Sequence, residues 1–451
     1  MKANKNTTRW LGLVLAGSII TLAASGQAGK PVKPPKPPPE PTLTYTLVPF
    51  DTGPWLGSAA RGITEAGLVV GSGDYEYVWE VTNRANLPWP TVATTTDTDS
   101  DGVLDAPLPL PVLDGHLNGA AHRANEFGLI VGGTGFPVSG GPPPAGYEQG
   151  VVWVPGASGY AAHGVGVIDA RLTDSWAGCV NNNGVVAGMC SWDYVGNWWR
   201  AYIIVPEETA DGLTWFRDDN ADGVNDLMLP IWPGPDPALL PGESTPMDPV
   251  AEIVAINDDG VVVGSIDNNY GRVEEAVFAI VPDYEDADGD GNPWFAEDAE
   301  GYNGLLRGLP PLSAGAYTAP SDINASGEIA GTSDYHAVIW RPDANGAYTI
   351  QDLGAFRQRD HLRVSALSDT GWLVGRAYNL GIGASWPKNK PKPALTLVWQ
   401  DGQMYVLEDI LSNGDGWTDL SFSDVSNEGI LAGHGTFNGK VTACLAVPNL
   451  P

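Results

Sequence analysis

Three acidic segments carry the clearest chemical pattern in this sequence. The first runs from Asp97 to Asp105 as DTDSDGVLD, the second from Asp218 to Asp226 as DDNADGVND, and the third begins at Asp286 as DADGDG. Each places carboxylate or amide side chains at positions one, three and five, with glycine at position six. Ca²⁺ prefers six to eight hard oxygen ligands, and this spacing supplies several while the glycine allows a sharp bend. The pattern therefore predicts calcium binding.

The predicted ligands are the carboxylates of the three segments and one amide: Asp97, Asp99, Asp101, Asp105, Asp218, Asn220, Asp222, Asp226, Asp286, Asp288, Asp290 and Glu297. The segments resemble the calcium loops of EF-hands, dockerins and thrombospondin type 3 repeats. They lack the helical flanks of EF-hands, and Leu108 and Leu229 stand where an EF-hand has its twelfth-position glutamate. Asp105 and Asp226 are expected to serve instead, whereas Glu297 occupies the twelfth position of the third loop. The alternative is three solvated acidic turns without a metal.

The elements that carry these loops repeat along the chain. An apolar residue, a polar residue, two variable residues, Gly, three mostly apolar residues and Gly recur seven times, at 63–71, 124–132, 180–188, 256–264, 323–331, 367–375 and 425–433. The first glycine of each copy predicts a hairpin turn with positive φ. The apolar run after it predicts a short buried strand, and the second glycine predicts a bulge or a close backbone approach.

Further strand-like segments flank each hairpin. An apolar strand such as Val151–Trp153 follows, and a leucine-rich strand such as Leu108–Leu110 precedes most copies, with Tyr45–Val48 in that place for the first. Four short strands in each of seven units predict an all-β, seven-bladed β-propeller; a β-solenoid and tandem sandwiches are the alternatives. The strand near Tyr45 is expected to close the ring against the last unit. The acidic loops are expected between units, after units one, three and four, on the face of the hairpin turns.

The repeats resemble those of the bacterial extracellular HAF-repeat family, in which Ile-Asn-x-x-Gly-x-Val-Val-Gly is followed by His-Ala-Phe-Leu-Trp. Residues Ile256–Gly264 and Ile323–Gly327 match the first half, and His336–Trp340 matches the second half with Val338 in place of Phe. The resemblance covers nearly all of residues 43–450. It implies an exported, β-rich protein of no established activity.

The N-terminal residues predict export. Lys2, Lys5 and Arg9 precede an apolar stretch over 10–24 and a small-residue cleavage site at 26–28. We interpret residues 1–28 as a signal peptide, with an uncleaved anchor as the alternative, 29–42 as a proline-rich linker and 43–451 as the seven-repeat propeller. The expected location is bacterial and secreted, periplasmic or on the cell surface.

The net charge of the chain limits which classes of partner it can bind. Residues 1–41 hold six Lys or Arg and one acidic residue, which leaves 17 of the 23 basic and 53 of the 54 acidic residues to the rest of the chain, a net charge of −36. Such a domain repels nucleic acid and anionic membranes and attracts cations. Part of the acidity is explained by solubility alone.

Function is less sharply indicated than fold. The sequence has no His-Glu-x-x-His, Gly-x-Ser-x-Gly or phosphate-loop motif, and its six histidines are scattered. We therefore predict a monomeric, non-catalytic scaffold whose calcium-ordered loop face binds a protein or a glycan. The alternative is a secreted propeller glycoside hydrolase or polysaccharide lyase.

Two features stay open at this point. The tryptophans outside the repeated strand position either line a glycan-binding face or fill the interior under long loops: Trp192, Trp198, Trp199, Trp215 and Trp294. Cys179 and Cys190 flank one hairpin and either pair or stay free, whereas Cys444 is expected to be a buried thiol.

Overall fold

The computed structural model describes residues 43–80, 83–135, 148–170, 172–191, 199–210, 212–231, 251–266, 277–299, 302–356, 361–379 and 393–449. Contacts divide the chain into Met1–Pro41 and Thr42–Pro451, and all the described residues belong to the second unit. The predicted signal peptide and linker, together with Trp192 and Trp198, lie outside the described residues. Within those residues no helix is long and apolar enough to cross a bilayer.

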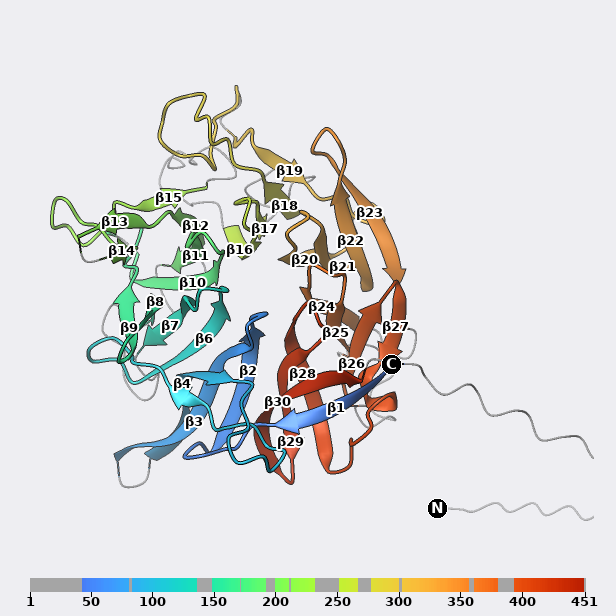
Figure 1. Ribbon diagram of the computed structural model, residues 1–451. Helices are drawn as coiled ribbons and strands as arrows, with labels where there is room; N and C mark the ends of the chain where they lie inside the picture. The colour runs from blue at the N-terminus through green and yellow to red at the C-terminus, as the bar shows by residue number, and fades with distance from the viewer. Residues whose placement is uncertain are drawn as a thin grey trace, which may run out of the picture. The chain divides into compact units, whose positions relative to one another are not determined.

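The second unit is an all-β propeller of seven four-stranded antiparallel blades (Figure 1). Each blade is given from its innermost to its outermost strand. The first four blades are β2 (Gly57–Ile63), β3 (Leu68–Glu80), β4 (Asn83–Thr94) and β5 (Leu108–Pro109); β6 (Asn118–Ala124), β7 (Ile130–Gly135), β8 (Glu148–Gly156) and β9 (Gly159–Gly164); β10 (Asp174–Val180), β11 (Val186–Ser191), β12 (Trp199–Ile204) and β15 (Met228–Pro230); and β16 (Ala251–Ile256), β17 (Val262–Ile266), β18 (Val277–Ile280) and β19 (Leu306–Gly308).

The remaining three blades complete the ring. They are β20 (Thr318–Ile323), β21 (Ile329–Ser333), β22 (His336–Pro342) and β23 (Tyr348–Gly354); β24 (His361–Leu367), β25 (Leu373–Tyr378), β26 (Leu395–Gln400) and β27 (Gln403–Val406); and β28 (Trp417–Val425), β29 (Leu431–Phe437), β30 (Lys440–Asn449) and β1 (Thr44–Pro49). A separate hairpin, β13 (Glu207–Thr209) and β14 (Gly212–Thr214), and the 3₁₀ turn η2 (Leu407–Asp409) lie in connections.

The N-terminal strand closes the ring, as the sequence predicted. Strand β1 pairs antiparallel with β30, from Thr44 opposite Asn449 to Pro49 opposite Cys444. The hydroxyl of Tyr45 also donates to the carbonyl of Gly429 at 3.1 Å. The last blade is therefore built from both ends of the folded unit, and backbone hydrogen bonds between β1 and β30 close the ring.

The glycine pairs of the repeat have two separate roles. The first glycine of every pair has φ between +75° and +87°, in the turn between the inner strand and its neighbour. The second glycine faces a β-bulge in the inner strand of every blade. A Cβ at Gly188 would lie 1.9 Å from the carbonyl oxygen of Trp176. The predicted bulge and close approach are therefore confirmed.

The polar residue at the second position of the repeat fixes the turn. In each of the seven turns its side-chain oxygen accepts a hydrogen bond from the backbone N–H four residues later: Thr64, Asn125, Asn181, Asn257, Asn324, Ser368 and Ser426. Three of these asparagines also reach the next blade; for example, Asn181 Nδ2 donates to Asn257 O at 2.9 Å. The repeated turns therefore also connect neighbouring blades to each other.

The next position of the repeat links the blades into a ring. The backbone N–H of one blade donates to the side chain of the following blade at six of the seven junctions, through Glu126, Asn182, Asp258, Asp369, Asn427 and Glu65. The bond from Asn427 N to Glu65 Oε1, 2.7 Å, joins the last blade to the first. At the seventh junction, between blades four and five, the corresponding residue is Ala325, whose side chain cannot accept a hydrogen bond.

The phase of the repeat differs from the sequence interpretation. The leucine-rich strand before each hairpin is the outermost strand of the preceding blade, because the repeated turn joins the first and second strands of a blade. The acidic loops accordingly lie within blades one, three and four, between the third and fourth strands, and not between units. The acidic loops and the repeated turns lie at the same end of the blades. In the first blade, Thr95 N donates to Gly67 O between the two connections at 3.2 Å. We call this side the loop face and the opposite side the pocket face.

The hydrophobic core lies between blades. Seven clusters of buried residues fill the seven junctions. Trp153, Trp340 and Trp399, from the repeated strand position, are fully buried there. Cys179 and Cys190 are free thiols that belong to different clusters on opposite sides of one blade, which explains why they do not pair. Cys444 is a buried thiol, as expected.

Candidate functional site

The seven bulges of the inner strands build one cavity on the propeller axis. The bulged residue of each blade lines a cavity of about 920 Å³: Arg61, His122, Gly178, Val254, Ser321, Ser365 and Ser423. A bulge turns a side chain away from the regular alternation of its strand. The residues two positions earlier, including Trp176, Glu252 and Arg363, also line the cavity, as do Arg376 and Tyr378 of β25. The cavity therefore extends from the bulges toward the pocket face; we call it the axial pocket.

Three arginines give the axial pocket a charge opposite to that of the domain. Arg61, Arg363 and Arg376 line it, and Glu252 is the one carboxylate among the described lining residues. None of the three arginines has a carboxylate within 4.0 Å in the described part of the chain. Burial lowers the pKa of Arg61, which Asp74 partly offsets. Unpaired guanidinium groups gathered in a concavity are a binding site for anions.

Two buried nitrogen atoms near these arginines lack partners. Nε of Arg376 and Nδ1 of His434 are buried and make no hydrogen bond in the described structure. Burial, then the charges of Arg61 and Arg376, lower the pKa of His434. A buried polar atom without a partner costs free energy, so an oxygen-rich ligand would gain by satisfying it.

The axial pocket also contains two ionisable groups of altered pKa. Burial, assisted by the charges of Arg61 and Arg123, lowers the pKa of His122 to about 4, so its imidazole is neutral at physiological pH. Burial raises the pKa of Glu252, and Arg363 acts in the opposite direction. The pocket thus combines permanent positive charge with one neutral imidazole.

A buried ionic network lies one step nearer the loop face. Arg123 Nη1 is 3.0 Å from Asp424 Oδ2, and both side chains are largely buried. Asp424 also accepts the backbone N–H of Ile63, and Asp322 that of Leu367, both at 3.0 Å. Burial raises the pKa of Asp322 to about 6, although Arg123 lowers it. These contacts involve the inner strands of five blades: β2, β6, β20, β24 and β28.

The first two acidic loops share one geometry on the loop face. Asp97 accepts the N–H groups of Asp101 and Gly102 at 3.2 and 2.9 Å, and Asp218 accepts those of Asp222 and Gly223 at 3.1 and 2.9 Å. Ser100 and Ala221, at equivalent positions, both have φ of +60°. The sequence likeness of the two loops is therefore a likeness of conformation.

The predicted ligands gather only in part. One oxygen from each of Asp97, Asp99 and Asp101 lies within 4.8 Å of the other two, and the same holds for Asp286, Asp288 and Asp290. In the second loop Asn220 Nδ2 donates to Asp222 Oδ2 at 3.0 Å. The charge of Asp101 raises the pKa of Asp99, a repulsion that a cation would relieve. These three-residue groups fit the oxygen chemistry of Ca²⁺.

The three residues expected to complete the loops make other contacts. Asp105 accepts the backbone N–H and the hydroxyl of Thr98, and Asp226 Oδ2 accepts the N–H of Asp219 at 2.7 Å. Glu297 pairs through its backbone with Asn303. Asp105 and Asp226 thus each hold the start of their own loop, and their part in calcium binding stays a prediction.

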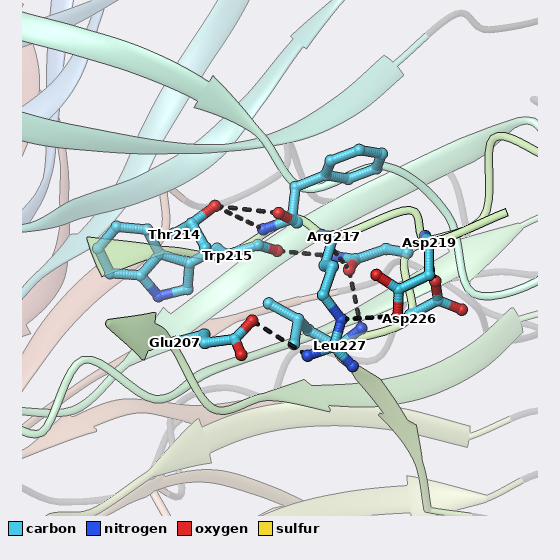
Figure 2. A network of polar contacts seen from close by, with 9 residues as sticks. Glu207, Thr214, Trp215, Arg217, Asp219, Asp226 and Leu227 are labelled. Atoms are coloured by element: carbon cyan, nitrogen blue, oxygen red, sulfur yellow. Dashed lines mark hydrogen bonds and ion pairs between the residues drawn. The ribbon is translucent and has the colours of Figure 1, made fainter. Parts of the chain in front are cut away.

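Arg217 anchors the second loop to its blade (Figure 2). Its Nη1 lies 3.0 Å from Glu207 of the β13–β14 hairpin and its Nε 3.2 Å from Asp219, while its carbonyl oxygen accepts the N–H of Asp226 at 2.7 Å. All three charged side chains are well exposed, so each ion pair contributes little to stability. Together they fix the orientation of the loop.

The tryptophans of the long connections belong to the interior. Trp215 and Trp294 are at most 1% exposed, and their Nε1 atoms donate to Gly184 O and Gly260 O, each at 2.8 Å. Each ring therefore packs a long connection against the repeated turn of the same blade. Neither ring is available to line a glycan-binding face. Nothing is assigned to the side chain of Trp199, which lies outside the described side chains.

The axial pocket was not predicted from the sequence, although a signal for it was present. Each bulged residue stands two positions before the first apolar residue of its repeat, as Arg61 does before Ile63 and His122 before Ala124. Aligned repeats would show that position as one column. Arg363 and Arg376 would still have been missed, because they meet only through the pairing of β24 with β25.

Comparisons with known proteins find only remote likenesses to solved structures. No protein-family model and no curated protein matches it. A mutant of Trypanosoma rangeli sialidase displaying trans-sialidase activity is 12% identical over 83% of this chain and 58% of its own, with a TM-score of 0.36. A polysaccharide lyase of family PL25, an ulvan lyase, is 11% identical over 89% of this chain and 93% of its own, with a TM-score of 0.39. A Hadza microbial sialidase is 12% identical over 90% and 65%, with a TM-score of 0.33.

The chain thus spans less than two thirds of the length of these two sialidases. The activities in their names are those proteins' own. Membership of the HAF-repeat family stays a prediction.

Proposed function

We propose that this chain is an exported β-propeller that binds an anionic saccharide in its axial pocket. The observation that carries the proposal is the set of three arginines, without ion-pair partners among the described residues, that lines one concave site of an otherwise acidic domain. Guanidinium groups bind carboxylate and sulfate oxygens through paired, charge-assisted hydrogen bonds. A saccharide is favoured over a small inorganic anion because the pocket of about 920 Å³ also presents Trp176, Tyr378 and four serines.

Titration calorimetry on the full chain tests this function. The probes are hexagalacturonate, a sulfated hexasaccharide and neutral maltohexaose. At least one of the two anionic probes should bind and the neutral one should not. Arg376→Ala should weaken binding about 10- to 100-fold, since a hydrogen bond to a charged group is worth about 1.5–3 kcal/mol. Arg307→Ala, on the outermost strand β19, is the matched control and should leave the affinity unchanged.

Absence of binding by both anionic probes would contradict the proposal. So would equal affinities of the wild type and Arg376→Ala with an unaltered thermal midpoint. Measurements at several salt concentrations distinguish a site of defined geometry from diffuse charge attraction, which falls steeply as salt rises.

A lyase is the second candidate, and the neutral His122 favours it over a hydrolase. Elimination in a uronan requires a base for the proton next to the carboxylate and a cation to stabilise the charge that develops there. His122 and Tyr378 are candidate bases beside the arginines. Hydrolysis with two carboxylates would need a partner for Glu252, and the described lining residues hold none. Formation of unsaturated, ultraviolet-absorbing ends from polygalacturonate, lost in His122→Ala or Tyr378→Phe, would establish the lyase; binding without this product supports the scaffold.

Calcium on the loop face is a separate part of the proposal. We propose that the two carboxylate groups at Asp97–Asp101 and Asp286–Asp290, with the similar loop at Asp218–Asp222, hold Ca²⁺ and order these connections. Calcium should raise the thermal midpoint and slow proteolysis within 97–105, and chelator should reverse both effects. Asp101→Asn should reduce the protection at its own loop only. Identical melting and cleavage with calcium and with chelator would contradict this assignment.

A further inference from the structure

A row of four aromatic rings leads from the surface of the pocket face to the axial pocket. Tyr317 stacks on Tyr335 with ring centroids 6.1 Å apart, Tyr335 meets His361 edge-on at 4.4 Å, and His361 stacks on Tyr378 at 5.6 Å. Tyr378 itself lines the axial pocket. We call these four side chains the aromatic row. No step of the proposed function uses its outer members, Tyr317 and Tyr335.

The aromatic row adjoins the arginines through strand pairing. In the β24–β25 ladder His361 lies opposite Tyr378, and Arg363 lies opposite Arg376. Residues two apart on a strand project from the same side, so the aromatic pair and the cationic pair are neighbours on one surface. A ligand that places an anionic group on the arginine pair can therefore extend directly over the aromatic pair.

The outer end of the row is exposed and conformationally strained. Tyr317 is 60% and Tyr335 38% exposed. Asp334 and Tyr335 form the two-residue turn between β21 and β22, with φ of +51° and +62°. Such turns favour Asn-Gly because both residues need positive φ, and a tyrosine there is held against its backbone preference. An exposed aromatic ring in a strained turn is typical of a binding position, since neither burial nor turn formation requires it.

We propose that the aromatic row forms subsites for successive sugar rings of an anionic oligosaccharide whose charged group occupies the axial pocket. This inference rests on the proposed function and deepens it, because it makes the ligand a chain and not a single sugar. The apolar face of a pyranose ring stacks on aromatic side chains, and amphipathic rings such as tyrosine supply such contacts at little cost in conformational entropy. Carboxylate and sulfate groups both carry the negative charge that the arginines of the axial pocket require.

The test compares chain lengths by titration calorimetry on the full chain. The probes are galacturonate, hexagalacturonate, a sulfated monosaccharide with its matching hexasaccharide, and hexa-aspartate as an acidic peptide. In the wild type a hexasaccharide should bind at least about tenfold more tightly than its monosaccharide. Tyr335→Gly and Tyr317→Ala should each remove most of this gain and leave monosaccharide affinity unchanged. Glycine accepts the backbone conformation of Tyr335, so that variant is expected to fold.

Phe127→Ala is the matched control, because Phe127 is a 72%-exposed aromatic residue in a turn of the loop face. It should change neither affinity. Equal binding of monosaccharide and hexasaccharide, or a length gain that survives both tyrosine variants, would overturn the aromatic row and leave the arginine site standing. Binding of hexa-aspartate as tight as that of the hexasaccharides would overturn the saccharide assignment. If no saccharide bound at any length, the proposed function itself would fail.

Discussion

The buried carboxylate of Asp322 should make the propeller less stable as pH rises from 4 to 7. Burial raises the pKa of this group from the ordinary 3.8 to about 6. Between these values the folded protein holds a proton that the unfolded chain has released, so stability falls as pH increases and the loss is complete above about pH 6. The difference between the two pKa values corresponds to about 3 kcal/mol.

Asp322→Asn isolates this contribution, since it removes the titration and keeps the shape. Asp322 accepts backbone N–H groups from Ile323 and Leu367, each at 3.0 Å, and an amide oxygen can retain only one of these bonds. The variant should therefore be about 1 kcal/mol less stable than the wild type would be with Asp322 fully protonated. Because only the wild type loses stability as pH rises, the difference between the two proteins should shift by about 2 kcal/mol in favour of the variant from pH 4 to pH 7.5.

Urea unfolding at the two pH values measures this difference. Asp114→Asn, at an exposed carboxylate outside the network, is the control for a change of charge alone. Arg123→Met would remove the cation that lowers the pKa of Asp322, so in that variant the fall in stability should be larger and extend to higher pH. If Asp322→Asn and the wild type differed by the same amount at pH 4 and pH 7.5, the assignment of a buried, proton-binding Asp322 would be refuted.

Three further substitutions have expected outcomes. Ala325→Asn should supply the acceptor missing from the seventh junction and raise the free energy of unfolding by about 1 kcal/mol in urea titrations; no gain would contradict the inter-blade ring as a stabilising element. Gly188→Ala should cost about 2–3 kcal/mol in the same assay, because its Cβ would meet the Trp176 carbonyl at 1.9 Å, whereas Gly133→Ala, with its nearest neighbour at 3.6 Å, should cost far less. Glu252→Gln should tighten hexagalacturonate binding a few-fold, by about 1 kcal/mol or less, and calorimetry showing weaker binding would mean that the carboxylate contacts the ligand.

The sequence was sufficient for the repeat and for the closure of the ring. Both follow from local chemistry: the first glycine of each pair must adopt positive φ, and the second must allow an inner-strand carbonyl within 2.6 Å of its missing Cβ. The strand near Tyr45 was expected to close the ring against the last unit, and it pairs with β30 there. The phase of the strands was not determined, because a leucine-rich strand such as 108–110 fits equally well as the last strand of one blade or the first of the next.

The candidate site was largely beyond sequence reasoning. The acidic loops were found because their predicted ligands are contiguous in sequence, and the loops share a hydrogen-bonded start at Asp97 and Asp218. The axial pocket collects residues from seven inner strands, and a single arginine in one of them, such as Arg61, has no distinguishing pattern. Tyr335 offered a partial signal, since Asp-Tyr replaces the glycine-containing pair expected between two strands only two residues apart.

The two faces of the propeller impose opposite requirements on a ligand. The turns of the loop face carry Glu65, Glu126, Asp258 and Asp369 around the axis, and the mutual repulsion of carboxylates there contributes to the raised pKa of Glu65, for which burial is the larger cause. The axial pocket, by contrast, is positively charged, and it is lined by residues that lie a few positions away on the same inner strands. At a Debye length of about 10 Å the acidic surface repels an approaching polyanion only at short range, so the arginines select their ligand by contact and not by long-range attraction. A chain that also stacks on the aromatic row supplies such contact at several points, which is why an oligosaccharide suits this domain better than a small anion does.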